Sequence, residues 1–488
     1  MAALGLAGLG TGSLTGCSGQ ARESQAAQIA IIGGGIAGLT CAWRLRQAGV
    51  EAEVYDALPR LGGRILTDRT TFATQHCELG AEFINSDHLH MLRLATELGI
   101  ELLDYQTDVK GLSEPDYFFG GRLLTGKELT AAFAPVAEAI ELEHARLSHT
   151  EIDSAWKANP RAQELDRLSL AEWLAGIHAE DPIRTLIEVA FTAEFGLDPG
   201  QNNVLNMLLM ISADAERLEL LGDSDERFHA SGGNQLFISR LVDRLDSGRL
   251  HTGHALESLA SRPDGRYVLG FTRSAAATEV LATHVILALP FSILRTVRLD
   301  VDLPPVKRKA IDELGYGANT KLIAGLSARP WRAQHASGSI YTDLAFQTCW
   351  EASRLQPWDG GIVTSYTGGR PAIAMADGGT SERSAEFCHQ LGQIFPGAAE
   401  AASGKSVRMA WHRQPFAKGS YSAYLTGQYT TIAGTEGVAV ARLHFCGEHT
   451  CPEYQAYMEG GAQSGERVAG EILADLRLRR TEQEAKGR

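Results

Sequence analysis

The sequence predicts an α/β protein of two or more domains, and three observations point to this class. The chain has 488 residues, more than one typical domain holds. Residues 28–56 have the pattern of a strand, a glycine-rich turn, a helix and a second strand. A mostly helical stretch over 86–221 is followed by strand-like segments over 249–290, so helices and strands are mixed along the chain.

The first expected element is a buried parallel strand at 28–32, a short apolar run with β-branched side chains. Gly33, Gly35 and Gly38 follow in a GxGxxG pattern, then a helix over 39–48. Gly33 permits a tight turn, Gly35 lets the backbone approach a pyrophosphate, and Gly38 lets the helix pack on the strand. The start of the helix offers free N–H groups to phosphates.

The second strand is expected at 50–55 and ends on Asp56, 18 positions beyond the last glycine of the turn. The Asp56 carboxylate can accept hydrogen bonds from ribose hydroxyls, which favours an adenosine without a 2′-phosphate. Strand, turn, helix and acidic residue together predict a Rossmann-like dinucleotide-binding unit.

The next motif distinguishes FAD from NAD. Arg60-Leu61-Gly62-Gly63-Arg64 follows the second strand, and an ordinary NAD-dependent dehydrogenase has no use for it. Arginine suits this place because its planar fork makes two hydrogen bonds to phosphate at once. The stretch resembles the RxGGR element of the FAD-dependent amine oxidase family.

Five further blocks resemble the same family and stand in the family's order. They are Glu78–Ile84, His284–Pro290, Tyr316–Lys321, Phe445–Thr450 and Tyr457–Arg467. In the family the first block lies beside the flavin ring, the third carries an active-site lysine and the last two form a C-terminal signature. The resemblance covers most of the chain.

The resemblance implies an α/β fold of two intertwined domains. A Rossmann-like FAD-binding domain would be assembled from three discontinuous segments, 28–90, 225–300 and 411–475. A substrate-binding domain with a mixed sheet and helices would come from 91–224 and 301–410. Helices are expected at 130–148, 169–176 and 460–478, a last strand at 444–447, and a frayed charged tail at 476–488.

Three residues are the catalytic candidates that the resemblance implies. Tyr421 and Tyr457 match an aromatic pair that flanks the amine, and facing rings interact with an amine through their π-faces. Lys321 matches a lysine that holds a water near the reactive flavin nitrogen. Ser420 stands where covalently flavinylated relatives have a cysteine, and serine forms no thioether, so FAD should be bound noncovalently.

The remaining site residues are expected to bind FAD. The full set is Gly33, Gly35, Ile36, Ala37, Gly38, Asp56, Ala57, Arg60, Gly63, Arg64, Gly80, Ala81, Glu82, Phe83, Trp411, Gly447, Glu448, Tyr457 and Met458. Glu466 and Arg467 are expected near the phosphates as well.

The substrate is expected to be an amine without a carboxylate. Amino-acid oxidases of this superfamily clamp the carboxylate with an arginine in the block that here includes Glu82 and Phe83, where none stands. Another arginine, such as Arg370, could still reach a substrate carboxylate from the substrate-binding domain. Glu82 has two open interpretations, a site for a second cationic nitrogen or a structural salt bridge.

The expected reaction is FAD-dependent oxidation of an amine to an imine by hydride transfer, with hydrolysis to an aldehyde or ketone and reduction of dioxygen to hydrogen peroxide. Four alternatives remain open. They are an amine dehydrogenase with a protein or quinone acceptor, an L-amino-acid oxidase, an oxidase of nonpolar substrates and a noncatalytic flavin-binding protein.

The amino-acid composition limits the kinds of molecule that the protein is expected to bind. The chain is 44% apolar and 21% charged, with a net charge of −14 and no basic patch, which argues against nucleic acid. The acidity would suit a cationic substrate or serve solubility alone. None of the seven cysteines has a metal-binding spacing, so no metal site is predicted; Cys446 and Cys451 are either bridged or free. The oligomeric state is open.

Residues 1–27 resemble an export leader. Leu14-Thr15-Gly16-Cys17 is similar to the end of a bacterial lipoprotein signal, and the low hydrophobicity also suits a twin-arginine signal. The positively charged start of either signal is missing, so a Gly-rich leader without function is the alternative. The expected location is periplasmic or membrane-anchored through a lipidated Cys17, and otherwise cytoplasmic. No other segment has the roughly 18 apolar residues of a membrane span.

Overall fold

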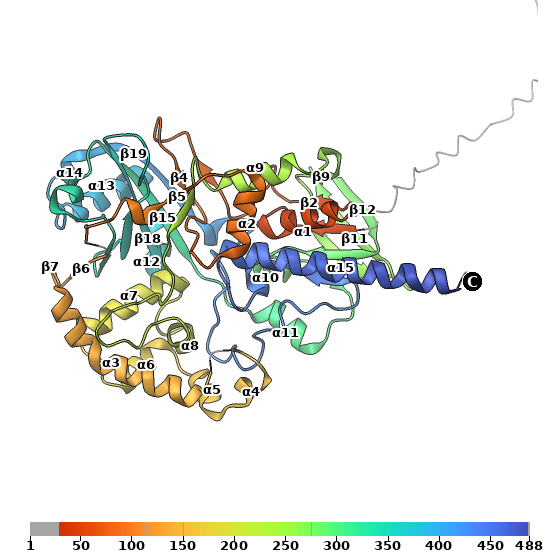
Figure 1. The fold of residues 1–488 in the computed structure, drawn as a ribbon, viewed down its shortest axis with the longest axis horizontal. Coiled ribbons are helices and arrows are strands. Elements are labelled where there is room, and N and C mark those ends of the chain that lie inside the picture. Colours follow the sequence, from red (N-terminus) through yellow and green to blue (C-terminus); the bar gives the residue numbers. More distant parts are fainter. Residues whose placement is uncertain (1–28, 114, 150, 275, 487–488) are drawn as a thin grey trace, which may run out of the picture.

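A five-stranded parallel sheet forms the centre of one lobe (Figure 1). The computed structural model describes residues 29–113, 115–149, 151–274 and 276–486. The order of the strands is β20 (Leu443–Phe445), β13 (His284–Leu287), β1 (Ile29–Ile32), β2 (Glu53–Tyr55) and β9 (Leu250–His251). All four residues of β1 are buried, because a parallel sheet is covered on both faces.

Helices cover one face of this sheet. They are α1 (Ile36–Gln47), α2 (Leu89–Leu98), α9 (Gln235–Asp243) and α15 (Met458–Lys486). Ile29 and Ile31 belong to the apolar cluster under these helices, whereas Ala30 and Ile32 belong to the cluster on the opposite face. This alternation follows from the two-residue period of a strand.

The opposite face carries a smaller, four-stranded sheet. Its order is β12 (Ala276–Ala282), β11 (Tyr267–Arg273), β10 (Ala255–Ser261) and β14 (Arg298–Asp300). The short helices α10 (Phe291–Leu294) and α11 (Pro305–Glu313) then lead the chain into the second lobe.

The second lobe is built on a seven-stranded, mostly antiparallel sheet. Its order is β19 (Ala402–Ala410), β15 (Asn319–Leu326), β18 (Gly361–Gly368), β17 (Thr348–Glu351), β16 (Ile340–Thr342), β6 (Asp116–Phe119) and β7 (Arg122–Leu123). Helices α12 (Gly369–Met375), α13 (Thr380–Leu391) and α14 (Ala398–Ala401) lie beside it (Figure 1). Every residue of β15 is buried, so this strand is the core of the lobe.

A helical layer completes the second lobe. Its members are α3 (Gly126–Leu147), α4 (Ser154–Ala158), α5 (Pro160–Leu165), α6 (Leu170–Gly176), α7 (Ile183–Phe195) and α8 (Val204–Leu208). Capping boxes begin α3, at Thr125 and Glu128, and α6, at Ser169 and Glu172. Helix α7 packs on strands β16 and β18 and ends beside the interlobe cavity.

The element boundaries differ from the sequence prediction in several places. Helix α1 begins at Ile36, three residues earlier than expected, because the glycine turn leads directly into it. Strands β6 and β7 interrupt the stretch expected to be helical and join the distant large sheet. Helix α15 runs to Lys486, through most of the stretch expected to fray.

The described part of the chain contains six cysteines and all of them are free, Cys446 and Cys451 included. Cys17 and the leader over 1–27 lie outside the described residues. Among the described helices, none combines the length and apolar character that crossing a membrane requires.

Close packing of α15 on α1 predicts opposite effects for two glycines of one helix. A Cβ at Gly465 would lie 2.3 Å from the Ala37 carbonyl oxygen, whereas a Cβ at Gly470 meets nothing within 4 Å. Gly465→Ala should therefore cost about 1–3 kcal/mol through overpacking. Gly470→Ala, at an exposed helical position, should stabilise by about 0.4–1 kcal/mol. Thermal unfolding of both variants checks this, and equal midpoints would show that the helices do not approach so closely.

Candidate active site

One cavity of about 1110 Å³ extends from the parallel sheet of the first lobe to the large sheet of the second. At one end it touches Gly33 and Asp56, just beyond the carboxyl ends of β1 and β2. At the other end it touches Lys321 on β15 and Tyr366 on β18. Ligands of open α/β sheets bind at the carboxyl ends of the strands, so the position fits a dinucleotide.

The glycine turn at the first end has the geometry of an anion site. Gly33 has φ +112°, and a Cβ there would lie 2.4 Å from the Ala288 carbonyl oxygen. A Cβ at Gly35 would meet nothing within 4 Å, so open space adjoins this backbone. No side chain caps the start of α1 and no acidic residue stands in its first turn. The amide groups there face the cavity and suit a pyrophosphate.

Gly38 is the one predicted cofactor residue that does not line the cavity. A Cβ at Gly38 would lie 2.0 Å from the Gly33 carbonyl oxygen, so its role is the close packing that the motif predicts. All the other residues of the predicted set line the cavity, together with Lys321 and Tyr421.

Asp56 is fixed by the backbone around it. Its carboxylate accepts hydrogen bonds from the Gly34 N–H at 2.8 Å and from the Leu58 N–H at 2.8 Å. Burial raises the pKa of Asp56, while these two bonds and the Arg60 charge oppose the rise. Each carboxylate oxygen keeps a lone pair, so it can still accept from a ribose hydroxyl.

An ion pair connects the RxGGR motif with the C-terminal blocks. The guanidinium of Arg64 lies 2.9 Å from the Glu448 carboxylate and also donates to the Ser420 carbonyl. Glu448 in turn accepts from the hydroxyl of Ser422 at 2.6 Å and from the Ala456 N–H at 3.0 Å. Burial opposes ionisation of Glu448, but Arg64 and the other partners hold its pKa below the ordinary value. The pair thereby places the segments that carry Tyr421 and Tyr457.

Lys321 is buried and its ammonium group has three acceptors from one segment of the other lobe. Its Nζ donates to the Glu82 carboxylate at 2.6 Å, the Gly80 carbonyl at 2.8 Å and the Glu78 carbonyl at 3.2 Å. The ammonium also lies 5.3 Å from the centre of the Trp350 ring. The indole N–H of Trp350 donates to the second oxygen of Glu82 at 2.9 Å. Glu82 is therefore the salt-bridge partner of Lys321, whose ammonium group balances its negative charge.

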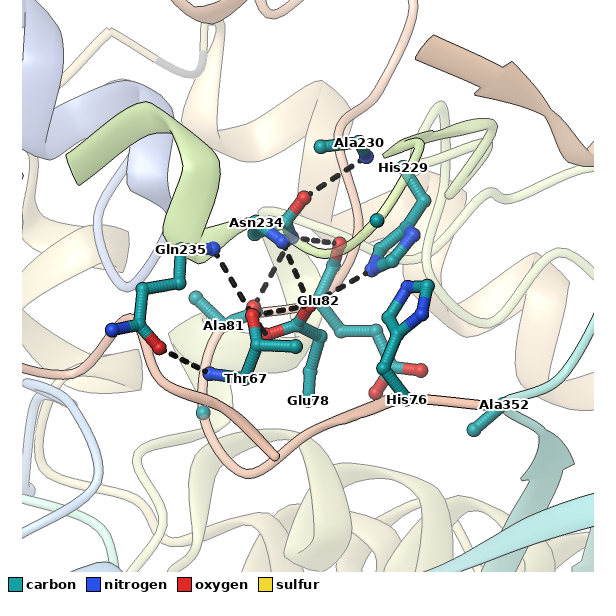
Figure 2. Close-up of polar contacts among 12 residues, drawn as sticks. Thr67, His76, Glu78, Ala81, Glu82, His229, Ala230, Asn234, Gln235 and Ala352 are labelled. Carbon is teal, nitrogen blue, oxygen red and sulfur yellow. Dashed lines mark hydrogen bonds and ion pairs between the residues drawn. The ribbon is translucent and has the colours of Figure 1, made fainter. Parts of the chain in front are cut away.

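A network around the Glu78 side chain fixes this segment (Figure 2). Glu78 ends β4 (Cys77–Glu78), and its carboxylate accepts from the Asn234 N–H at 2.8 Å and from the Thr67 hydroxyl. His229, on β8 (Phe228–Ala230), lies 3.1 Å from the same carboxylate. The amide of Asn234 donates to the Glu82 carbonyl. Burial opposes ionisation of Glu78, but the bonds from His229, Asn234 and Thr67 hold its pKa below the ordinary value.

Aromatic rings form the walls around Lys321. Tyr421 and Tyr457 line the cavity, as the resemblance implies, and each ring is half-buried. Phe83, which was expected beside the flavin, also lines the cavity. Two further rings, Trp350 and Tyr366, were not singled out in the sequence because they carry no motif. The hydroxyl groups of Tyr366 and Tyr421 lie 2.7 Å apart, and Tyr421 donates to the Glu194 carbonyl.

Three charged residues considered from the sequence lie outside the cavity. Glu466 lies between helices, paired with Arg44, and Arg467 donates to the carbonyls of Gly437 and Phe445, so neither lines the cavity. Arg370 pairs with Asp198 outside the cavity, and its side chain is 84% exposed. Charged residues near a motif were expected at phosphates, but they hold the surrounding helices and loops together instead.

Comparison with known proteins agrees with this geometry. The model of the family described as flavin containing amine oxidoreductase matches residues 36–473. The chain belongs to this family. It is therefore an FAD-dependent amine oxidoreductase, and its two lobes correspond to the two-domain fold of FAD amine oxidases.

Relatives match almost end to end. A protein of Mycobacterium tuberculosis named as flavin-containing monoamine oxidase AofH is 26% identical over 470 residues, with 92% of this chain and 97% of the relative covered. A putrescine oxidase structure with bound putrescine has a TM-score of 0.76 at 21% identity, covering 92% of this chain and 99% of its own. Cyclohexylamine oxidase from Brevibacterium oxydans has a TM-score of 0.77 at 21% identity, covering 93% and 100%. The two structures show that the fold is shared.

The network around Glu78 predicts a pH-dependent loss of stability. Glu78→Gln replaces a charged acceptor of several hydrogen bonds and should cost about 2–4 kcal/mol at neutral pH. Because the folded-state pKa of Glu78 is lowered, its contribution is present above the ordinary glutamate value of about 4.3 and is lost as pH falls through the folded-state value. Urea unfolding of both proteins across about pH 2.5–7.5 checks this, because the loss is expected below about pH 4.3. A difference that stays constant through this acid range would contradict the ionised network.

Proposed function

We propose that the protein oxidises a small amine to an imine, that the imine hydrolyses to an aldehyde or ketone, and that dioxygen is reduced to hydrogen peroxide. One observation carries the proposal: a buried lysine and a set of aromatic rings close the end of the cavity that continues from the dinucleotide cradle. This arrangement supplies a cofactor site, a desolvated place for an amine and a fixed positive charge within one cavity.

The residues present fit FAD. The turn from Gly33 to the start of α1 suits the pyrophosphate, Asp56 suits the ribose, and Arg60 and Arg64 lie farther along the cavity wall. We propose that FAD is held noncovalently. The Ser420 hydroxyl donates to the Asn319 side chain at 2.6 Å, and serine offers no sulfur for a thioether to the ring.

When bound, FAD accepts the hydride equivalent from the carbon next to the substrate nitrogen. The protein must present that nitrogen unprotonated, because its lone pair assists cleavage of the C–H bond. Tyr421, Tyr457 and Tyr366 serve this purpose by excluding water, since desolvation favours the neutral amine over the ammonium form. Burial also raises the pKa of each of these tyrosines, so their rings stay uncharged at neutral pH.

Lys321 places its ammonium group in the wall of the cavity, where Glu82 and two carbonyls accept its hydrogen bonds. We propose that this charge assists the reaction with dioxygen, in which negative charge develops. The bond from Lys321 to the Glu78 carbonyl, at 3.2 Å, is the longest of the three. A water for the hydrolytic step would replace this bond most easily.

The first test is anaerobic stopped-flow bleaching of the flavin absorbance with monoamines, diamines, polyamines and amino acids. One class of amine should bleach the yellow protein rapidly, and air should restore the colour with formation of peroxide. Acid should release free FAD. Amino acids belong in the panel because Arg354, which donates to the Ser339 hydroxyl at 2.7 Å, also lines the cavity.

Two results would contradict parts of this proposal. Slow recovery in air after rapid bleaching would show that the acceptor is a protein or quinone. Failure of every amine to bleach the flavin would overturn amine oxidation itself, and substrates without nitrogen would then be tested.

Lys321→Met should slow reoxidation by dioxygen at least about 10-fold while leaving amine-dependent reduction less affected, because its charge acts on the oxidative step. Removing one partner of a buried pair also costs about 3–5 kcal/mol, so the variant needs a matched control. The double variant Lys321→Met/Glu82→Gln removes both charges and should recover stability. Stopped-flow reoxidation of the double variant separates the two effects. If the double variant is reoxidised at the wild-type rate, the lysine charge has no role in the reaction with dioxygen.

A further inference from the structure

Glu194 places an unpaired carboxylate in the cavity. It stands near the end of α7 and lines the cavity with a half-buried side chain. Its backbone carbonyl accepts from the Tyr421 hydroxyl, but within the described part of the chain its carboxylate forms no hydrogen bond or ion pair. Carboxylates that are removed from water are normally paired, so an unpaired one in a cavity calls for a ligand.

Four tyrosines line the same cavity as this carboxylate. Glu194 lies close enough to Tyr341, Tyr366, Tyr421 and Tyr457 to act on the pKa of each hydroxyl. Burial raises the pKa of Glu194 itself to about 7, and no described cation offsets this effect. A carboxylate and aromatic rings both attract an ammonium group, so together they form a suitable binding site for one.

The adjoining wall adds negative charge. Residues 217–227 line the cavity and contain four acidic residues, Glu219, Asp223, Asp225 and Glu226, against two arginines. Both arginines are already engaged, Arg217 with Glu219 at 2.6 Å and Arg227 with Asp104 at 2.7 Å. Charge of one sign along a cavity raises the local concentration of oppositely charged ligands. A cationic ligand is therefore favoured on this side.

We propose that Glu194 binds a second, protonated nitrogen of the substrate, so that dicationic amines such as short diamines are the preferred substrates. The inference rests on the proposed amine oxidation. The reacting nitrogen must be neutral, and a carboxylate would stabilise its protonated form, so the nitrogen at Glu194 is the one that does not react. Glu82 does not take this role, because the Lys321 ammonium group already balances its negative charge and Trp350 holds its second oxygen.

The test compares two substrates of matched length, 1,4-diaminobutane and n-pentylamine, by anaerobic flavin reduction. They differ in that a methyl group replaces the distal ammonium. The wild-type enzyme should be half-saturated by the diamine at a concentration about 30-fold lower, the ratio expected for a desolvated charge pair. Glu194→Gln should bring this ratio close to one while n-pentylamine still reduces the flavin.

Two further variants serve as controls. Glu188→Gln changes a carboxylate on the same helix that pairs with Arg184 outside the cavity, and it should keep the wild-type ratio. Glu194→Asp keeps the charge and should keep part of the preference, which a purely structural role would not predict.

The pH profile of the wild-type ratio is a second readout that needs no variant. The diamine preference requires the ionised carboxylate, so it should fall as pH drops below about 7. Taking the ratio of two amines cancels the protonation of the reacting nitrogen. The four tyrosines that face Glu194 have pKa values raised by burial and stay neutral throughout this range.

The outcomes separate the two proposals. If both amines reduce the flavin with equal half-saturation, or if Glu194→Gln weakens both equally, the binding site at Glu194 is wrong and amine oxidation stands. If neither amine reduces the flavin, nor any other amine, both proposals fall. The site is established if Glu194→Gln abolishes the preference for the diamine and Glu188→Gln keeps it.

Discussion

The buried ammonium group of Lys321 is the constraint on which the site depends. A charged group removed from water must be surrounded by acceptors, or its burial costs several kcal/mol. Strand β15 cannot supply them, because its own carbonyls are engaged in the sheet. The acceptors come instead from residues 78–82 of the other lobe. The two lobes therefore meet in one arrangement, and the cavity between them has a defined shape.

A second buried ion pair along the cavity also joins distant segments of the chain. Arg64 follows the first strands of the chain, whereas Glu448 follows the last strand, and their ion pair joins the two ends of the sequence. Isolated pairs of this kind add little net stability, because desolvation offsets much of the attraction. Separating them is expensive, however, so they select one arrangement of the segments over others. In this molecule they fix geometry more than they add stability.

The sequence predicted those parts of the fold whose causes are local. Gly33 is required by its own φ of +112° and Gly38 by its 2.0 Å approach to the Gly33 carbonyl oxygen, so the turn is recognisable without the rest of the chain. Tyr366 and Trp350 were missed because they lie on strands with no recognisable motif, and only sheet register brings them beside Lys321. The two interpretations of Glu82 remained open for the same reason. Its partners, Lys321 and Trp350, stand 239 and 268 positions away.

The charges of the cavity are divided by function. Two positive groups of the cavity are paired, Arg64 with Glu448 and Lys321 with Glu82, and their positions are fixed before any ligand arrives. The Glu194 carboxylate, by contrast, has no hydrogen-bond or ion-pair partner within the described part of the chain. An amine oxidase must bind a cation and yet react with a neutral amine, and one uniform environment cannot favour both. A carboxylate that binds one nitrogen of a diamine resolves the conflict, because the other nitrogen can then react in its neutral form.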